Sequence, residues 1–399
     1  MVLAAWLVIV TPLRAGNPPP GTWQSVASSA DGSKIVAAAS GELGASGAIY
    51  ISTNSGATWN SSILGNFDWE AVASSADGRK LITAWGLPST SGLVYISTNS
   101  GVTWAPPKIP PPAAEWNSVA SSADGTKLTA VAVNVAAVYT STNSGADWTG
   151  QTNGLDGTGV DYIACSADGN KLIVAAGAGN GHLFTSTNSG ATWLQATNAP
   201  VATWYSVASS ADGNQLLACS YFGGNVYIST NSGVKWTLTK LPTNDWNSVA
   251  SSADGTKLVA LANNNSAISG VGNGGIWTST DSGTTWVSNK VQSTAWTCAA
   301  MSADGNELIA SVGSPSTTGG IYVSKTTPSP ELNLATVNGQ STLSWIIPSR
   351  NFTLQQSSHL LAADWQNMTN VPVLNLTNLE NQVTLSPTNS TGFYRLAIP

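Results

Sequence analysis

The chain has 399 residues, of which only 9% are Asp, Glu, Lys or Arg, and its formal net charge is −6. Average globular domains carry about 25% charged residues, so Ser, Thr, Asn and the backbone must supply most of this polar surface. The sequence contains no block of basic residues. That absence excludes the clustered positive charge on which nucleic-acid binding depends.

Residues 1–16 have two interpretations. Val2–Val10 is an apolar run that ends shortly before Ala15 and Gly16, which is typical of a secretory signal with its cleavage site near Ala15. No basic residue precedes the run, however, and the alternative is that Leu3–Pro12 forms a strand completing the last repeat unit. A membrane-spanning helix needs about 20 apolar residues, and no segment has them, so we predict no membrane span.

From residue 17 onward the sequence repeats with a period of about 45 residues. The tetrapeptide SADG recurs seven times, with its aspartate at Asp31, Asp77, Asp124, Asp168, Asp212, Asp254 and Asp304. An aromatic residue precedes each copy, at Trp23, Trp69, Trp116, Tyr162, Trp204, Trp246 and Trp296. A second motif, STNSG or STDSG followed by two further residues and then Trp, comes after each of the first six copies. Its third position is occupied by Asn54, Asn99, Asn143, Asn188, Asn231 and Asp281.

Each unit is predicted to form four short strands. Trp246–Ser251 is the first, Asp254-Gly255 is a hairpin turn signal between two β-prone runs, and Lys257–Leu261 is the second strand. A stretch such as Val226–Thr230 is the third, and the fourth opens with Thr-Trp after the second motif. Four strands in a period of 40 to 50 residues predict a β-propeller. We therefore expect a seven-bladed propeller of antiparallel blades over residues 17–326.

The second motif resembles the Asp-box, or BNR, repeat of sialidases, sortilin-type receptors, xyloglucanases and photosystem II assembly factors. The resemblance extends from about Gly21 to Lys325 and implies a propeller. Asn replaces the usual Asp in five of the six copies, which removes a carboxylate and weakens any metal-binding role. Either side chain can bond the backbone of its own turn, and the glycine permits positive φ. We therefore predict that the Asn or Asp of this motif and the seven SADG aspartates are structural.

Strand order places the two repeated turns on one face of the propeller and the variable loops on the other. Function concentrates on variable loops carried by rigid scaffolds, so we place ligand binding on this loop face. The repeated tryptophans are expected to pack between blades, with stacking on sugar rings as the alternative. Candidate ligand-binding residues on the loop face are Trp85, Tyr221, Phe222, Phe67, Asp68, Glu115, Asp161 and Asp245, and further aromatic or acidic side chains there are Tyr205, Glu42, Glu70 and Asp156.

The numbers and positions of Arg, His and Cys argue against several kinds of catalytic and metal site. A sialidase requires three arginines to hold the substrate carboxylate, but the propeller region contains only Arg79, which follows an SADG turn. The two histidines, His182 and His359, are far apart in the sequence. The cysteines Cys165, Cys219 and Cys298 stand where other units have Ser or Ala, so we predict small buried residues and no metal, cofactor or disulfide. A pair of loop-face carboxylates acting as a glycoside hydrolase is the remaining enzymatic alternative.

The seventh unit has its SADG turn and third strand but no second motif. Residues 327–399 then show short alternating stretches such as Thr342–Ile347 and Phe352–Gln356, which predict a small β-sandwich-like module, and its pattern is similar to short C-terminal modules of secreted bacterial proteins. The sequence as a whole predicts a secreted or cell-surface bacterial protein, monomeric and non-catalytic, that binds a glycan or an extracellular protein through its loop face. A surface protein without a small ligand remains a third possibility.

Overall fold

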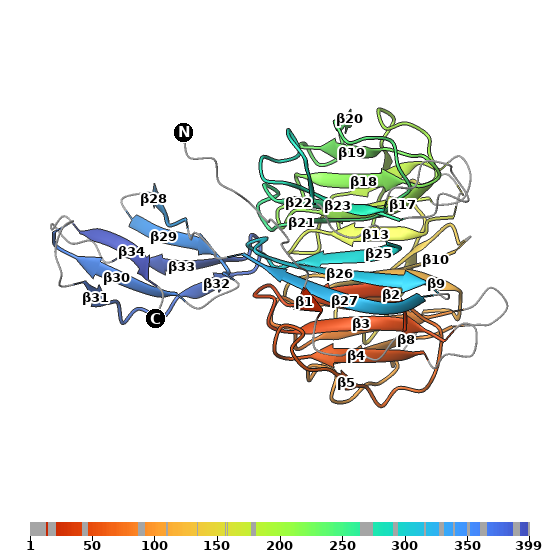
Figure 1. Cartoon of the computed structure of the whole chain (residues 1–399), viewed down its shortest axis with the longest axis horizontal. Helices are drawn as coiled ribbons and strands as arrows, with labels where there is room; N and C mark the ends of the chain where they lie inside the picture. Colours follow the sequence, from red (N-terminus) through yellow and green to blue (C-terminus); the bar gives the residue numbers. More distant parts are fainter. Residues whose placement is uncertain are drawn as a thin grey trace.

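The computed structural model is an all-β protein whose strands form a propeller and a smaller module beside it (Figure 1). It describes residues 13–14, 21–41, 47–86, 92–108, 111–133, 135–155, 157, 159–176, 181–263, 274–289, 294–314, 317–326, 331–337, 340–348, 352–359, 365–385 and 392–397. Within these ranges no helix has the length and hydrophobicity needed to cross a membrane.

The first four blades are antiparallel sheets whose strands follow chain order from the centre outward. Blade one contains β2 (Thr22–Ser28), β3 (Ile35–Ser40), β4 (Ala48–Ser52) and β5 (Asn60–Ser61). Blade two contains β6 (Trp69–Ser74), β7 (Leu81–Trp85) and β8 (Val94–Ser97), with an isolated Ile96–Ala105 bridge in the place of a fourth strand. Blade three contains β9 (Trp116–Ser121), β10 (Leu128–Ala132), β11 (Val138–Ser141) and β12 (Thr149–Gln151), and blade four contains β13 (Tyr162–Cys165), β14 (Leu172–Ala175), β15 (Leu183–Ser186) and β16 (Leu194–Gln195).

The last three blades continue the pattern and close the ring. Blade five contains β17 (Trp204–Ser209), β18 (Leu216–Ser220), β19 (Val226–Ser229) and β20 (Thr237–Leu238), and blade six contains β21 (Trp246–Ser251), β22 (Leu258–Ala262), β23 (Gly275–Ser279) and β24 (Val287–Asn289). Blade seven combines β25 (Trp296–Met301), β26 (Glu307–Ser314) and β27 (Thr317–Lys325) with β1 (Leu13–Arg14) from the other end of the chain. The N-terminal segment therefore supplies the outer strand of blade seven, through Leu13 and Arg14, whereas the predicted strand Leu3–Pro12 lies outside the described residues.

A ring of backbone hydrogen bonds joins all seven blades at the SADG turns. The alanine N–H of each turn donates to the alanine carbonyl of the next, from Ala30 through Ala76, Ala123, Ala167, Ala211, Ala253 and Ala303 back to Ala30, at 2.7–2.8 Å. Because each unit repeats the same turn, each turn presents one donor and one acceptor in the same geometry. The ring explains why SADG tolerates so little change, and it confirms the propeller architecture.

Buried aromatic pairs fill the blades, as the sequence predicts. Six of the repeated tryptophans are 0–2% exposed, and each packs edge-on against an aromatic residue of the third strand in its own blade, as in the Trp23–Tyr50 and Trp246–Trp277 pairs. Edge-to-face contacts of this kind add about 0.5–1.5 kcal/mol beyond area burial. These six residues are packing elements and are not available to a ligand.

Tyr162 departs from this pattern, and its assignment to the aromatic ring is wrong. It lies six residues before Asp168, whereas every other aromatic lies eight residues before its SADG aspartate. Val160, which is 0% exposed, takes the place of the tryptophan in the core. Asp161 therefore occupies the position that Glu70 holds in blade two, directly after the packing residue.

The two repeated turns of each blade lie on the same face, as predicted, because they are hydrogen-bonded to one another. In blade one the Ser55 N–H donates to the Ser33 carbonyl at 2.8 Å, and equivalent bonds occur in the next five blades. Within the STNSG turn, Asn54 Oδ1 accepts from the Thr58 N–H and the Trp59 indole donates to the Gly56 carbonyl. Ser55 adopts φ 54° and Gly56 φ 80°. The side chains of Asn54 and Trp59 therefore form hydrogen bonds within their own turn.

The carboxylates of the SADG aspartates also form hydrogen bonds within their own turns. In blade two the Ser75 hydroxyl donates to Asp77 Oδ1 at 2.6 Å and the Arg79 N–H donates to the same oxygen at 2.9 Å. Partial burial opposes ionisation, but these bonds outweigh it and lower the pKa of Asp77. The same balance lowers the pKa of Asp124, Asp168 and Asp212.

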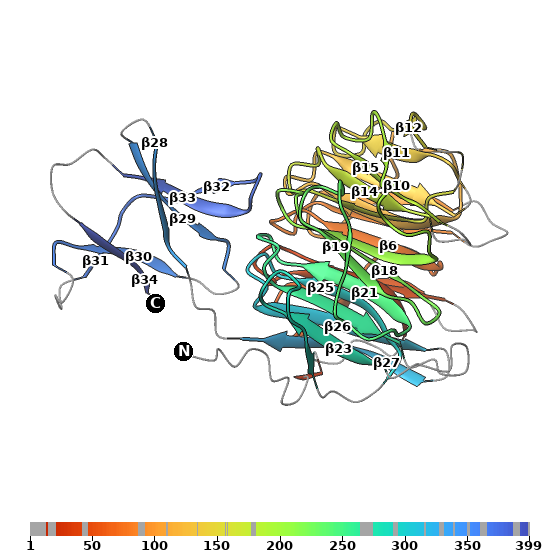
Figure 2. The same cartoon turned by 90° about the horizontal axis from the view of Figure 1, so that it is seen from above.

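Strands β28 (Asn333–Val337), β29 (Gln340–Ile346), β30 (Thr353–Ser357), β31 (Gln366–Asn367), β32 (Val373–Asn375), β33 (Glu380–Thr384) and β34 (Phe393–Ala397) form the C-terminal module. They make two sheets, β28-β29-β33-β32 and β31-β30-β34, around a core of Leu343, Trp345, Leu354 and Val383. The predicted sandwich-like module is thus present, and Figure 2 shows it at one end of the propeller.

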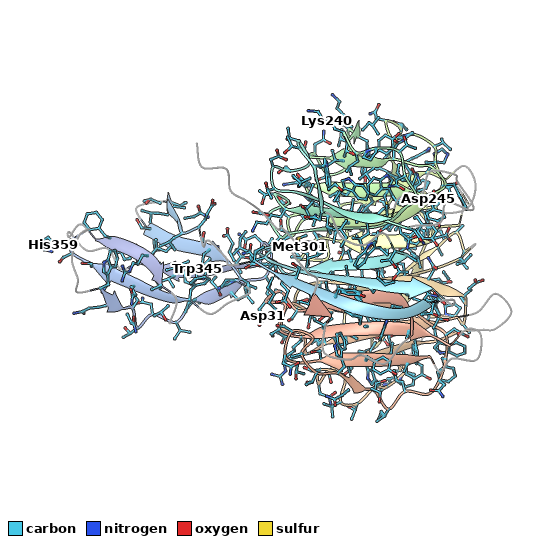
Figure 3. All side chains as sticks on the ribbon, viewed as in Figure 1. Asp31, Lys240, Asp245, Met301, Trp345 and His359 are labelled. Atoms are coloured by element: carbon cyan, nitrogen blue, oxygen red, sulfur yellow. The ribbon has the colours of Figure 1, made fainter. Side chains whose placement is uncertain are left out.

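The C-terminal module covers the centre of the turn face. Leu379, Ile346 and Ile347 pack against the ring of SADG alanines, and Leu379 lines the end of a central cavity of about 170 Å³. Serines of the innermost strands and turns, the seven SADG alanines, Cys165 and Met301 line the rest of the cavity. In Figure 3, Asp31 and Met301 lie at the end of the propeller nearest this module, and Asp245 lies at the opposite end. The opposite, loop face carries no such cover from the described part of the module.

Candidate functional site at the loop face

In six of the seven blades, the loop end of the innermost strand carries one residue that is displaced from the regular strand pairing. Pairing of the first and second strands slips by one residue beside the packing tryptophan in six blades. The positions directly after the packing residue are Gln24, Glu70, Asn117, Asp161, Tyr205, Asn247 and Thr297. Such bulges redirect a side chain away from the regular ladder. Because the innermost strands surround the axis, these seven residues lie around the axis at the loop end of the blades, and this ring of residues is called the mouth hereafter.

Two amides of the mouth tie neighbouring blades together. Asn117 Nδ2 donates to the Asp161 carbonyl at 2.8 Å, and Asn247 Nδ2 donates to the Thr297 carbonyl at 2.9 Å. Each bond runs from one blade to the next. Two pairs of neighbouring blades, three with four and six with seven, are therefore joined at the mouth.

Four aromatic residues form a continuous cluster on one side of the mouth. Tyr205 stacks on Tyr221 with ring centres 4.7 Å apart, Tyr162 lies 5.5 Å from Tyr205, and Phe222 meets Tyr221 edge-on at 4.7 Å. Phe222 is 57% exposed and Tyr205 is 36% exposed. The cluster, hereafter the aromatic cluster, thus runs from a buried inner end to an open outer end.

The local backbone forces Phe222 outward. It adopts φ 55°, in the left-handed region that residues other than Gly, Asn and Asp rarely enter, and Gly223 follows at φ 69°. The Gly223 N–H donates to Asp245 Oδ1 at 2.8 Å, and Gly224 bridges to Asn244. Asp245 is fully buried, so its role in the structure is to hold the loop that presents Phe222.

Glu70 belongs to blade two, three blades away from Tyr205 around the ring. Burial raises the pKa of Tyr205, and the neighbouring Tyr221 phenol and Glu70 carboxylate raise it further. Burial, with Tyr205 and Asp161 nearby, raises the pKa of Tyr162 well above its ordinary value. Both phenols are therefore neutral near pH 7, and neither is activated as a nucleophile.

The remaining candidates occupy other parts of the loop face. Phe67 stacks on Trp85 at 4.5 Å and forms a second, smaller aromatic pair in blade two. Asp68 Oδ1 accepts from the Ser40 hydroxyl at 3.0 Å and the Gly41 N–H at 2.8 Å, so it anchors the end of the blade-one loop. Glu115 is half-buried and precedes Trp116, and Asp161 is 6% exposed at the mouth. Glu42 and Asp156 lie outside the described residues.

Metal binding and thiol chemistry find little support. Within the described ranges no group of three or more His, Cys, Asp or Glu side chains is placed to hold a metal ion. The three cysteines are unpaired. Burial raises the pKa of Cys165 to about 12 and that of Cys298 to about 11, and it also raises the pKa of Cys219. Protonated thiols of this kind are poor nucleophiles and poor ligands.

Sequence reasoning named Tyr205 and Glu70 but did not recognise that they occupy equivalent positions in their blades. The signal that finds them is the spacing to the SADG aspartate, which shows that both follow a packing residue. The inter-blade lysines described below, Glu307 and Leu379 were missed as well. Their roles depend on contacts between blades or between domains, which no local pattern contains.

The proteins of known structure that resemble this chain share its propeller fold at low sequence identity. No family model and no curated protein matches the sequence. Among solved structures, a GH74 xyloglucanase from Xanthomonas campestris matches with TM-score 0.57 and 14% identity over 84% of this chain, which spans 59% of that protein. YCF48 bound to D1 peptide matches with TM-score 0.57 and 14% identity over 79% of this chain and 96% of that one. YCF48 from Cyanidioschyzon merolae matches with TM-score 0.56 and 13% identity over 78% and 98%.

Proposed function

We propose that this protein is a non-catalytic Asp-box propeller of the cell exterior that binds carbohydrate on the aromatic cluster of its loop face. The observation that carries the proposal is the Tyr205–Tyr221–Phe222 part of the aromatic cluster at the mouth, in which Tyr205 and Phe222 are exposed. Flat apolar ring faces with polar groups nearby suit sugar rings, and binding sites combine such surfaces with a few placed polar groups.

The division between the two faces supports the choice of the loop face. The turn face is covered at its centre by Leu379 and its neighbours, and its repeated polar side chains are bonded within their own turns. On the loop face, by contrast, a buried carboxylate and a strained backbone hold an aromatic ring in solvent. Strain of about 1–2 kcal/mol persists where the surroundings enforce it, and here the bond from the Gly223 N–H to Asp245 helps to enforce it.

The test is titration calorimetry with a panel of hexasaccharides against the wild-type chain and Phe222→Asn. Asn tolerates the left-handed conformation better than Phe, so the variant is expected to fold and to gain about 0.5–1 kcal/mol of stability. It removes the exposed ring, and we expect its affinity to fall about tenfold or more, in line with the loss of about 1.5 kcal/mol of ring contact.

Leu238→Ala is the matched control because Leu238 is an exposed apolar residue of the same blade, in β20. It should bind as the wild type does. Equal affinity of Phe222→Asn and the wild type, or no hexasaccharide binding by the wild type at all, would contradict the proposal.

A glycoside hydrolase is the second candidate, and one observation favours it. Glu70 and Asp161 occupy equivalent positions on blades two and four and place two carboxylates around one mouth, and hydrolases of this class act through such pairs. One structural neighbour is a xyloglucanase. Release of reducing ends from xyloglucan by the wild type, abolished by both Glu70→Gln and Asp161→Asn, would establish this alternative and displace the non-catalytic assignment.

A further inference from the structure

The two sheets of the C-terminal module end in four edge strands, and three of these edges are protected. β31 and β32 have only two and three residues. β34 carries Arg395, whose Nε donates to Gln355 Oε1 at 2.9 Å and whose guanidinium lies over the Trp365 ring. Short strands and charged side chains are common means by which proteins prevent pairing between sheet edges. The fourth edge, β28, has neither.

β28 is an unprotected edge strand of five residues. Asn333–Val337 contains no charged residue, proline or glycine, pairs with β29 without a register shift, and is exposed at every position. Among the described strands β29 is its only partner, so alternate residues of β28 direct their N–H and C=O groups away from the sheet. Figure 1 and Figure 2 both show β28 at the upper margin of the module.

The strand also leaves a core-facing leucine uncovered. Leu334 pairs with Leu343 and therefore shares the sheet face that Leu343 directs into the core of the module. Leu343 is 2% exposed, whereas Leu334 is 61% exposed. The sheet that contains β28 has four strands and the sheet packed against it has three. The β28 end of this face thus extends beyond its cover.

An exposed sheet edge can be completed by a strand from another molecule. We propose that β28 pairs with the β28 strand of a second copy of this chain, in antiparallel orientation about Ala335. Leu334 of one copy then lies opposite Thr336 of the other, and the two Leu334 side chains meet diagonally across the two-fold axis, within reach of long side chains. The pairing joins two four-stranded sheets into one sheet of eight strands. It departs from the monomer expected from the sequence.

The charge pattern favours a second copy as the occupant. In the register centred on Ala335, Glu331 lies opposite Gly339 of the other copy, and it is the only charged residue between positions 331 and 339. Like charges placed opposite each other destabilise a sheet, and this pairing contains none. A strand of five residues is too short to bury the roughly 1,200–2,000 Å² of a standard stable interface. We therefore expect a weak dimer, with a dissociation constant on the order of 100 µM.

Sedimentation equilibrium of the full chain at low salt, at concentrations up to about 1 mM, tests the pairing. We expect the wild type to be a mixture of monomer and dimer. Leu334→Lys and Leu334→Glu each place two like charges beside the two-fold axis, and each should weaken the dimer about tenfold or more. Both variants should keep the wild-type melting temperature because Leu334 is exposed. An equimolar mixture of the two places opposite charges at the axis and should restore the dimer.

Val373→Lys is the matched control because Val373 is an exposed apolar residue of β32, the opposite edge strand of the same sheet. It should dimerise as the wild type does.

Four results would overturn the inference. A wild type that is monomeric throughout the concentration range does not form the pairing. Dimers that survive unweakened in both Leu334 variants would place the interface elsewhere, and loss of the dimer in Val373→Lys alone would assign it to β32. If both Leu334 variants are monomeric and their mixture is monomeric as well, β28 contacts a different segment of the second copy.

Discussion

At the residue scale, two buried carboxylates have structural roles. One holds the loop that carries Phe222, and the other lies where blade seven meets blade one. Asp245 is fully buried and holds the Gly223 N–H, which fixes the loop that turns Phe222 outward. Glu307 is the second such group. It stands in blade seven at the position where five other blades have lysine, and it pairs with Lys325 at 2.9 Å.

Glu307 gives the seam between the last and first blades a pH dependence. Burial raises the pKa of Glu307 from 4.5 to about 7, although Lys325 opposes the shift. Between those values the folded state holds a proton that the unfolded state has released, so stability falls as the pH rises from about 4.5 to about 7 and stays low above.

We therefore expect Glu307→Gln to raise the free energy of unfolding by roughly 1–3 kcal/mol at pH 8, after allowing for the loss of the half-exposed Lys325 pair. At pH 4.5 the variant should match the wild type. Chemical denaturation at both pH values measures this, with the exposed Glu331→Gln as control. A variant that is less stable than the wild type at pH 8 would show that the ion pair outweighs the burial of the carboxylate.

At the element scale, five lysines act as braces between successive blades and are called the inter-blade lysines. They stand at the third position after the SADG aspartate and bond to the adjacent blade: Lys34, Lys80, Lys127, Lys171 and Lys257. Lys80 Nζ donates to the Asp124 carbonyl at 2.9 Å and to the Ser144 hydroxyl at 3.2 Å, which links blade two to both turns of blade three. Lys34 makes the equivalent pair of bonds to blade two. Blade five has Gln215 at this position, and its Nε2 has no hydrogen-bond partner among the described residues.

Replacing this glutamine by lysine should restore the missing brace. We expect Gln215→Lys to stabilise the protein by about 1 kcal/mol, because a charge-assisted bond replaces a buried amide without a partner. The melting temperature measures the gain, and Lys171→Gln, the reverse change in blade four, should cost a similar amount. A lower melting temperature for Gln215→Lys would show that blade six does not offer the acceptors that blade three does.

The sequence predicts much at this scale because the repeat supplies seven parallel observations. Strand positions, the shared face of the two turns and the packing of six tryptophans follow from periodicity and strand order. Tyr162 was wrongly grouped with the packing tryptophans because it is aromatic. Its spacing to Asp168 differs from theirs and would have shown the difference. The partners of Lys80 and Gln215 were not foreseeable, since they belong to adjacent blades.

At the scale of the whole molecule, the two ends of the propeller axis differ. At one end, Leu379 packs among the SADG alanines and covers the centre of the turn face. It lies in the turn between β32 and β33 and adopts φ 57°. The other end presents the mouth and the aromatic cluster. The sequence predicted a C-terminal module but not its position, because docking onto a ring of seven alanines depends on the assembled propeller.

Leu379 should be the residue that fixes the C-terminal module to the propeller. Leu379→Asp places a charge in the apolar ring, and we expect the C-terminal module to detach, with an increase in the radius of gyration measured by small-angle X-ray scattering and faster hydrogen exchange at the turn face. Leu376→Asp, in the same turn but more exposed, should leave both unchanged. Unaltered scattering from Leu379→Asp would mean that other contacts hold the C-terminal module in place.

The central claim is that the repeated turns are scaffold and that the mouth of the loop face is the site of function. A crystal structure of the chain soaked with a hexasaccharide that it binds in calorimetry tests it most directly. We predict a sugar ring on Phe222 or Tyr221. Sugar bound instead at the STNSG turns, or on the C-terminal module with the mouth empty, would contradict it.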